Sequence, residues 1–272
     1  MNHPEPSGQD QAAEHNRRAW DRLVRNKQRF TRPAKDDEFH DPLKVLDGNR
    51  WLGNAVLGAQ LLCLAAGGGR QAPLYAAAGA KVTVVDISAE QLSLDRQVAA
   101  EKDLDICTVQ TSMDDLSMFA DQAFDIVIHP VSTCYLPKIA PVYREVARIT
   151  RPHGLYISQH KQPTSLQAST LPSENGYELL TPYYCEAQPL PAVQGSLHRE
   201  EGTLEYLHRW DQLIGEMCRA GFVIEDLTEP CHANSQAAIG TFAHRSTFVA
   251  PYVRIKARRM ASPAANRVWL PE

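Results

Sequence analysis

The stretch that most constrains the fold of this chain runs from Leu61 to Asp86 and reads LLCLAAGGGRQAPLYAAAGAKVTVVD. It begins and ends with short apolar runs, and between them lie three consecutive glycines followed by a helix pattern rich in small residues. Short apolar runs bounded by glycine are typical of parallel strands that are buried on both faces. The stretch therefore predicts a strand, a tight glycine turn, a helix and a second strand.

The chemistry expected of such a unit is the binding of a nucleoside cofactor. A glycine turn at the start of a helix brings a ligand against bare backbone N–H groups. An acid at the end of the second strand, here Asp86, can bind the two hydroxyls of a ribose. The loop alone does not identify the cofactor, because Gly67-x-Gly69-x-x-Ala72 also satisfies the fingerprint of dinucleotide-binding proteins.

Composition describes an ordinary globular protein and argues against several kinds of partner. Of the 272 residues, 43% are hydrophobic and 22% are charged, and the formal net charge of −4 gives no general attraction to nucleic acid or to an anionic membrane. No apolar run approaches the roughly 20 residues of a membrane span, and the polar N-terminal residues carry no secretion signal. The six cysteines are scattered without a C-x-x-C pair, which predicts free thiols in a reducing cytoplasm and no metal site.

Strands and helices continue to alternate along the chain after Asp86. Further strands are expected at residues 106–110, 124–128, 155–158, 222–227 and 252–257, with helical patterns between several of them. This alternation predicts an α/β fold, with a doubly wound, seven-stranded, mostly parallel sheet in one domain over residues 15–260.

Two segments interrupt the alternation. Residues 15–55 place an amphipathic helix and a Pro-rich connector ahead of the first strand, and we expect them to form an N-terminal helical cap. Residues 161–208 are rich in Pro, Ser, Gln and aromatic residues and are too long for a plain loop, which predicts an inserted substrate lid. Residues 1–14 are expected to be a disordered tail, and residues 261–272 a C-terminal tail.

The motifs over residues 15–260 resemble, in their order and spacing, the class I S-adenosylmethionine (SAM)-dependent methyltransferases, and in particular the small-molecule type 11 branch. The glycine motif spans residues 61–69, Asp86 matches the ribose acid, and Ser112-Met113-Asp114 matches the turn beside the adenine. The strand at 124–128 and the step into the strand at 222–227 match as well. The resemblance implies a Rossmann-like methyltransferase fold, SAM as the cofactor, and methyl transfer to a small-molecule acceptor.

The resemblance also implies which residues contact the cofactor. These are Ala65, Gly67, Gly69, Asp86, Ile87, Ser112, Met113, Asp114 and His129. The chain departs from the family pattern at position 63, where Cys63 replaces a frequent Asp or Glu, and at position 65, where Ala65 replaces a frequent Gly. It also has Ser112 where the family commonly has Asp, so we expect Asp114 or the backbone to meet the adenine amino group.

Methyl transfer from a sulfonium is an in-line displacement, for which the protein holds the acceptor close, aligned and dry. A hydroxyl or an acidic carbon as acceptor also needs a general base, and the pKa of histidine suits this task. The candidate catalytic residues are His129, His160 and His208. The candidate substrate-facing groups are Tyr135, Tyr183 and Tyr184.

The sequence leaves two alternative functions open. One is an NAD(P)-dependent oxidoreductase of the Rossmann type, and the other is a protein that binds SAM or S-adenosylhomocysteine (SAH) without transferring a methyl group. The cap segment, the turn at residues 112–114 and the last strand favour methyl transfer over dinucleotide binding. The expected partner is a small-molecule acceptor, without nucleic acid or membrane, and the expected assembly is a monomer or a homodimer.

Overall fold

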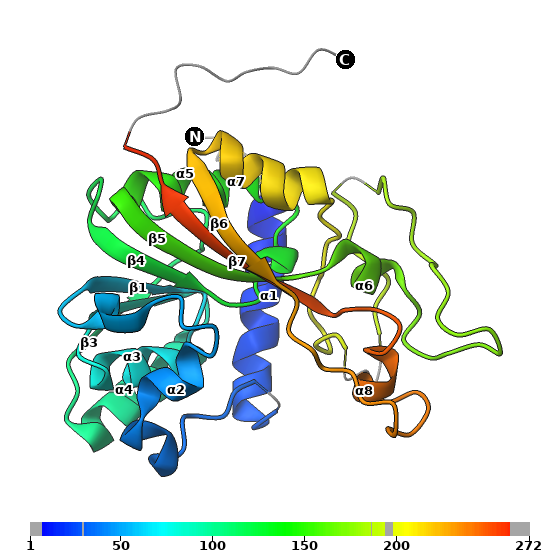
Figure 1. Ribbon diagram of the computed structural model, residues 1–272, viewed down its shortest axis with the longest axis horizontal. Helices are drawn as coiled ribbons and strands as arrows, with labels where there is room; N and C mark the ends of the chain where they lie inside the picture. The colour runs from blue at the N-terminus through cyan, green and yellow to red at the C-terminus, as the bar shows by residue number, and fades with distance from the viewer. Residues whose placement is uncertain (1–6, 29, 186, 194–197, 262–272) are drawn as a thin grey trace, which may run out of the picture.

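The structure is a computed structural model that describes residues 7–28, 30–185, 187–193 and 198–261, and its centre is a seven-stranded sheet with helices on both faces (Figure 1). The strand order is β3-β2-β1-β4-β5-β7-β6, and β7 runs antiparallel to β5 and β6 while the other neighbours are parallel. The strands are β1 (Gln60–Leu64), β2 (Lys81–Asp86), β3 (Ile106–Gln110), β4 (Phe124–His129), β5 (Thr150–Lys161), β6 (Phe222–Thr228) and β7 (Tyr252–Arg259). The expected doubly wound, mostly parallel α/β fold is confirmed.

The helices labelled in Figure 1 are α1 (Gly8–Arg25), α2 (Pro42–Leu46), α3 (Gln71–Ala77), α4 (Ala89–Lys102), α5 (Ala140–Ile149), α6 (Pro163–Gln167), α7 (Glu216–Arg219) and α8 (Phe242–Arg245). Short 3₁₀ turns occur at η1 (Asp36–His40), η2 (Gly53–Val56) and η3 (Thr133–Tyr135), and a π-helical turn, η4 (Asp211–Gly215), leads directly into α7. In the described part of the chain, none of the helices is both long enough and apolar enough to cross a membrane.

Two apolar clusters cover the two faces of the sheet. Along β1, Leu62 and Leu64 pack into one cluster together with side chains of α5 and α7, while Leu61 and Cys63 pack into the other with side chains of α3 and α4. All four of these β1 side chains are fully buried. Such burial on both faces explains why the strand is a continuous apolar run in the sequence rather than an alternating one.

Helix α1 begins earlier than the sequence analysis expected. Ser7 caps it by accepting a hydrogen bond from the Asp10 N–H, and the Asp10 carboxylate accepts in return from the Ser7 N–H at 3.0 Å. This reciprocal cap at Ser-x-x-Asp satisfies N–H groups that the first turn leaves unpaired. The expected disordered tail over residues 1–14 is therefore wrong for residues 8–14, and residues 1–6 lie outside the described part of the chain, as do residues 262–272 of the expected C-terminal tail.

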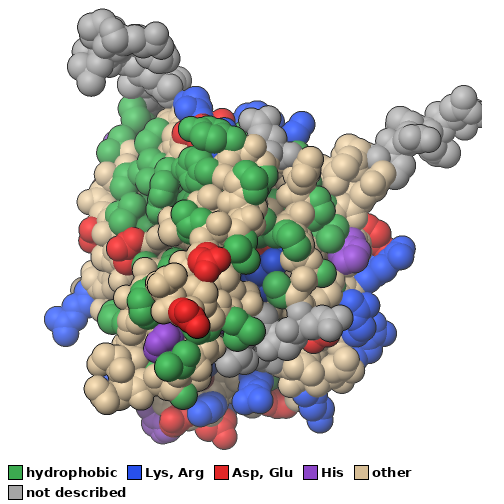
Figure 2. All heavy atoms as spheres, turned by 90° about the vertical axis from the view of Figure 1, so that its right-hand side faces the viewer, with side chains coloured by type: hydrophobic (Ala, Val, Ile, Leu, Met, Phe, Trp, Pro, Cys, Tyr) green, Lys and Arg blue, Asp and Glu red, His purple; other side chains and the backbone are tan. Residues whose placement is uncertain are grey.

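The segment between β5 and η4 forms a small layer beside the carboxyl end of β5. It contains α6 and a small apolar cluster of Leu166, Leu190 and Leu207. Arg245 of α8 is buried against this layer and donates hydrogen bonds to the backbone carbonyls of residues 165, 168 and 169. The face formed by this segment and α8 is turned toward the viewer in Figure 2, where apolar and polar side chains are interspersed.

Asn16 of α1 is buried and makes three hydrogen bonds, two of them to Leu204 of this layer and one to Tyr135 of η3. Its Oδ1 accepts from the Leu204 N–H at 2.7 Å, and its Nδ2 donates to the carbonyls of Tyr135 and Leu204 at 2.8 and 3.0 Å. We predict that Asn16→Ala lowers the free energy of unfolding by about 2–4 kcal/mol, because it leaves buried backbone groups without partners. Urea denaturation measures this loss.

The matched control is Asn26→Ala at the exposed C-terminal end of the same helix, where the backbone N–H of residue 26 donates to the carbonyls of Arg22 and Val24 and is kept in the variant. That variant should change the free energy of unfolding by less than about 0.5 kcal/mol. Similar losses in the two variants would show that Asn16 does not hold α1 in place.

Candidate functional site

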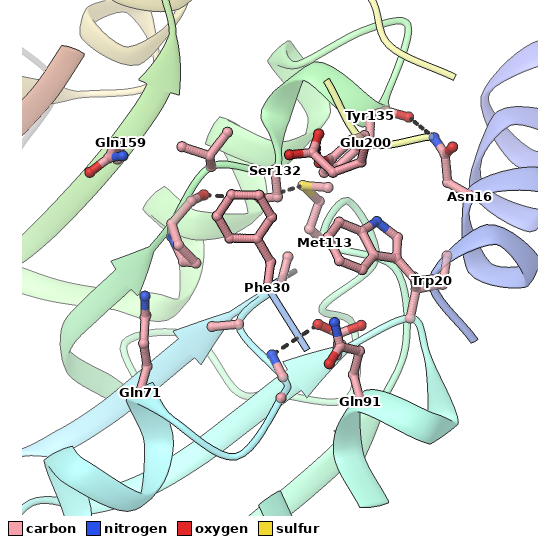
Figure 3. A pocket seen from close by; sticks show the side chains of 18 of the residues that line it. Asn16, Trp20, Phe30, Gln71, Gln91, Met113, Ser132, Tyr135, Gln159 and Glu200 are labelled. Carbon is pink, nitrogen blue, oxygen red and sulfur yellow. Dashed lines mark hydrogen bonds between the residues drawn. The ribbon is translucent and has the colours of Figure 1, made fainter. Parts of the chain in front are cut away.

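A pocket of about 600 Å³ opens at the carboxyl ends of β1, β2 and β4. This volume lies in the range of sites that enclose a small ligand. Side chains from distant parts of the chain line it, as Figure 3 shows for Trp20 of α1, Met113 after β3 and Ser132 after β4. Lining residues also come from the segment after β5 and from the region of α8 and β7, namely Glu200, His232, Phe242 and Tyr252.

The glycine loop after β1 forms one wall of the pocket, but its N–H groups do not face a ligand. The Gly67 N–H donates to Asp86 Oδ2 at 2.9 Å, and the N–H groups of Gly68 and Gly69 donate to the two carboxylate oxygens of Asp95, each at 3.0 Å. The expectation that this turn offers bare N–H groups is therefore wrong. Two carboxylates of the protein occupy them.

The glycines allow α4 to approach the loop closely. A Cβ atom at Gly67 would lie 2.7 Å from the Cβ of Gln91, and one at Gly69 would lie 2.9 Å from the backbone oxygen of Leu94. Gly69 also adopts a φ of +73°, which strains most other residues. Gly67 and Ala65 line the pocket, whereas Gly69 does not, because it packs beneath α4.

The carboxylate of Asp86 is held at the end of β2, at the edge of the pocket. Its Oδ1 accepts from the Ser88 N–H at 2.9 Å, and its other oxygen accepts from the loop. Burial raises the pKa of Asp86 to about 6, although the N–H donors from Ser88 and Gly67 lower it. Burial raises the pKa of Asp95 to about 7 against the same opposing effect of its loop donors.

The turn after β3 contributes two of its three predicted cofactor contacts to the pocket wall. Ile87, Ser112 and Met113 line the cavity. Asp114 does not, because its carboxylate accepts hydrogen bonds from the Ser112 hydroxyl and, at 2.9 Å, from Gln9 Nε2 of α1. The expected contact between Asp114 and the cofactor is corrected accordingly, and this side chain fastens α1 to the turn.

His129 ends β4 as expected, but its ring lies inside the protein. One ring nitrogen is hydrogen-bonded to the Tyr156 hydroxyl at 2.7 Å and the other to the Ser132 hydroxyl at 2.6 Å. Burial lowers the pKa of His129 to about 3, so the ring is neutral at physiological pH. The prediction that it contacts the cofactor or acts as a base is corrected, since Ser132 stands between the ring and the pocket.

His160 and His208 are also buried away from the pocket. The ring of His160 is hydrogen-bonded to the hydroxyls of Thr133 and Ser158, and Nε2 of His208 lies 3.1 and 3.0 Å from the carbonyl oxygens of Thr133 and Leu136. Burial lowers the pKa of His160 to about 3 and that of His208 to about 4. Both predictions of a catalytic base are corrected, because these rings support the turn at η3 from behind.

Of the three tyrosines expected to face a substrate, only Tyr135 lines the pocket. Its hydroxyl donates to Glu200 Oε2 at 2.8 Å. Tyr183 instead accepts a hydrogen bond from the Trp210 N–H, and Tyr184 is 80% exposed on the outer surface. The substrate-facing prediction is therefore corrected for Tyr183 and Tyr184.

A buried charge network behind Tyr135 was not predicted from the sequence. Lys161 Nζ, at the end of β5, donates to Glu200 Oε2 at 2.8 Å and to Glu205 Oε2 at 3.0 Å. Burial alone would raise the pKa of Glu200, but the ammonium group of Lys161 outweighs it and the pKa is lowered. Burial raises the pKa of Glu205, which also forms an ion pair with Arg199 at 3.3 Å, and of these four charged groups only Glu200 lines the pocket.

The pocket-lining residues that sequence reasoning missed come mostly from segments without a motif. Trp20 of α1 belongs to no motif, and it lies half-buried in the pocket wall against the ring of Tyr135, with the ring centroids 5.7 Å apart. Gln91 belongs to the helix-start pattern Ser88-x-x-Gln91, but this pattern does not indicate that its side chain lies against the glycine loop. In the described residues, no group of three or more His, Cys, Asp or Glu side chains is arranged to hold a metal ion.

Comparison with known proteins gives a consistent result. Residues 62–158 match the family model described as a methyltransferase domain. The chain is 33% identical over 230 residues to the uncharacterized methyltransferase YbaJ of Bacillus subtilis (strain 168). The matched region covers 79% of this chain and 89% of that protein. An S-adenosylmethionine-dependent methyltransferase from Mesorhizobium loti has the same fold with a TM-score of 0.62, at 21% identity over 79% of this chain and 100% of the other.

A second solved structure of the same fold is the 1,6-didemethyltoxoflavin-N1-methyltransferase of Burkholderia thailandensis, with bound 1,6-didemethyltoxoflavin and SAH. It is 14% identical, covers 96% of this chain and 93% of its own, and superimposes with a TM-score of 0.58.

The network around Lys161 generates a stability prediction. Lys161→Met should lower the free energy of unfolding at pH 8 by about 3–5 kcal/mol, because Glu200 loses its ammonium partner and Glu205 keeps only its ion pair with Arg199, at 3.3 Å. The two glutamates then favour their protonated forms in the folded state, whereas in the unfolded chain they titrate near pH 4. The folded variant therefore binds more protons, so its deficit relative to the parent should be smaller at pH 5 than at pH 8. Urea titrations at both pH values measure the change.

The control is Lys102→Met, which removes an ion pair to the exposed carboxylate of Asp36. It should cost less than about 1 kcal/mol at either pH. A Lys161→Met deficit that does not depend on pH would contradict the proposed role of the buried carboxylates.

Proposed function

The chain belongs to the class I SAM-dependent methyltransferases, and we propose that it methylates a small organic acceptor bound between Tyr135, Glu200 and Tyr252. The cofactor follows from the family, and the site of the acceptor follows from the side chains that line the pocket. The acceptor carries an N–H or O–H group, because the charged side chain that the lid segment brings to this part of the pocket is the carboxylate of Glu200.

The observation that carries the function is the occupation of the glycine loop by carboxylates. A dinucleotide places its pyrophosphate on free N–H groups at a helix N-terminus. Here the side chains of Asp86 and Asp95 accept from those N–H groups, so the loop has no free donors to offer a phosphate. SAM has no phosphate and carries a sulfonium and an ammonium group, so it suits this loop, whereas an NAD(P)-dependent oxidoreductase does not.

In this proposal each part of the cofactor lies against a different wall of the pocket. We assign the ribose to Asp86, whose carboxylate lies at the end of β2, and the adenine to the wall formed by Ile87, Ser112 and Met113. The methionine part then lies along the glycine loop toward Trp20. The cofactor supplies an electrophilic methyl group, so the protein has to hold the acceptor in line with it and exclude water.

The acceptor end of the pocket contains the groups needed for this task. Glu200 accepts a hydrogen bond from the acceptor and so orients its nucleophilic atom, while the ion pair with Lys161 keeps this carboxylate charged. The aromatic side chains of Phe242 and Tyr252 provide an apolar wall that excludes water. Residues 198–208 form the part of the lid that contributes Glu200, and Asn16 of α1 holds this part through Leu204.

We predict that the protein binds SAM and SAH and does not bind NADH, as measured by titration calorimetry of the purified chain. Asp86→Ala should weaken SAH binding at least tenfold, because the ribose hydroxyls lose their acceptor. Asp125→Ala at the opposite end of the sheet is the control and should leave the affinity unchanged. NADH binding without SAH binding would overturn the proposed function.

We predict that Glu200→Gln lowers methyl transfer at least tenfold and changes SAM affinity less than threefold, because Glu200 contacts the acceptor rather than the cofactor. SAH release in the presence of a fractionated small-molecule extract measures the transfer. The adjacent exposed residue gives the control Glu201→Gln, which should keep full activity. A Glu200→Gln variant as active as this control would contradict the placement of the acceptor.

A further inference from the structure

Asp95 of α4 is a fully buried carboxylate whose hydrogen-bond donors come from the glycine loop. Its Oδ2 accepts from the Gly68 N–H and its Oδ1 from the Gly69 N–H, both at 3.0 Å. The Gly68 N–H also lies 3.1 Å from the backbone oxygen of Gln91, another α4 group. Both N–H groups therefore point toward α4, although Gly68 itself lines the pocket.

The direction of these N–H groups determines the direction of the loop carbonyls. In a trans peptide the N–H and the preceding C=O point in opposite directions across a planar unit. Because the N–H groups of Gly68 and Gly69 point toward α4, the carbonyls of Gly67 and Gly68 point away from it. The loop thus presents oxygen atoms, with partial negative charge, on the side opposite to α4.

The described side chains near Asp95 do not supply it with a partner of opposite charge by hydrogen bonding. The neighbouring side chain from β1 is the thiol of Cys63, and burial raises the pKa of Cys63 well above its usual value, so that the thiol is neutral. Asp86 adds a second carboxylate on the other side of the loop, and Arg96, the next residue on α4, donates to the Thr108 hydroxyl. The donors that meet the Asp95 carboxylate are thus the N–H groups of the loop.

We infer that Asp95 is the positioning residue that sets the polarity of the cofactor loop. By holding two N–H groups inward, it keeps the Gly67 and Gly68 carbonyls available to the cationic methionine end of the cofactor. The contact discriminates against phosphate-bearing nucleotides at the same time, because they would meet carbonyl oxygens instead of donors. This inference rests on the proposed placement of the methionine part along the loop.

The test compares two ligands that differ in the part contacting the loop. SAH carries the ammonium group of the methionine part, and adenosine lacks that part entirely. Asp95→Asn keeps the shape of the side chain but replaces one acceptor oxygen by a donor, so that in the observed orientation only one of the two loop N–H groups still meets an acceptor. We expect SAH affinity to fall at least tenfold and adenosine affinity to change less than threefold, as measured by titration calorimetry.

Glu101→Gln, on the exposed side of α4, is the matched control and should change neither affinity. Equal losses for SAH and adenosine in Asp95→Asn would indicate a general loosening of the pocket and overturn the inference, as would unchanged SAH affinity. Failure of the parent protein to bind SAH would instead overturn the proposed function.

A second measurement keeps the inference testable if Asp95→Asn does not fold. Amide hydrogen exchange of the ligand-free parent protein, followed by NMR, should show the N–H groups of Gly68 and Gly69 exchanging at least a hundredfold more slowly than that of Gly48, which lies in an exposed turn. Exchange of the loop amides as fast as that of Gly48 would show that Asp95 does not hold them, and the inference would be wrong.

Discussion

The burial of one carboxylate against a glycine turn is the constraint on which the rest of this site depends. Asp95 can be buried without a cation because two loop N–H groups satisfy it, and they can reach it only because α4 lies directly on the glycines. The position of α4 in turn fixes Ser88, whose hydroxyl donates to Asp21 of α1 at 2.6 Å. The loop, the helix behind it and the N-terminal helix are thus placed by one connected set of hydrogen bonds.

The fold could be predicted from the sequence because each strand has a local signature. These signatures involve only residues that are close in the chain, namely the apolar runs LLCL and VTVV and the glycines between them. The observed bounds of β1 and β2 agree with these runs to within one residue at each end. The start of α1 was missed, since Ser7-x-x-Asp10 lies in a stretch whose polar composition suggested disorder. The capping pattern therefore indicates where α1 begins, whereas the average composition of these residues does not.

The catalytic assignment could not be predicted in the same way. His129 and His160 do lie at the carboxyl ends of strands, where ligands bind in such sheets. Whether a side chain at that position faces the pocket or the interior depends on its distant neighbours, here Tyr156, Ser132 and Thr133. The ion pair between Lys161 and Glu200 could not be predicted either, because the two residues are 39 positions apart and belong to no local pattern.

β7 is the last strand of the sheet to be synthesised, although it lies between β5 and β6 in the folded protein. β6 pairs only with β7 in the described sheet, and β7 also covers the edge of β5. During synthesis, β5 emerges from the ribosome about ninety residues before β7, whereas β6 precedes β7 by only about twenty residues, so the edge of β5 stays unpaired for this interval. Open strand edges invite wrong pairing. The same last strand brings Tyr252 to the pocket, so a nascent chain lacks a finished acceptor wall until its sheet is closed.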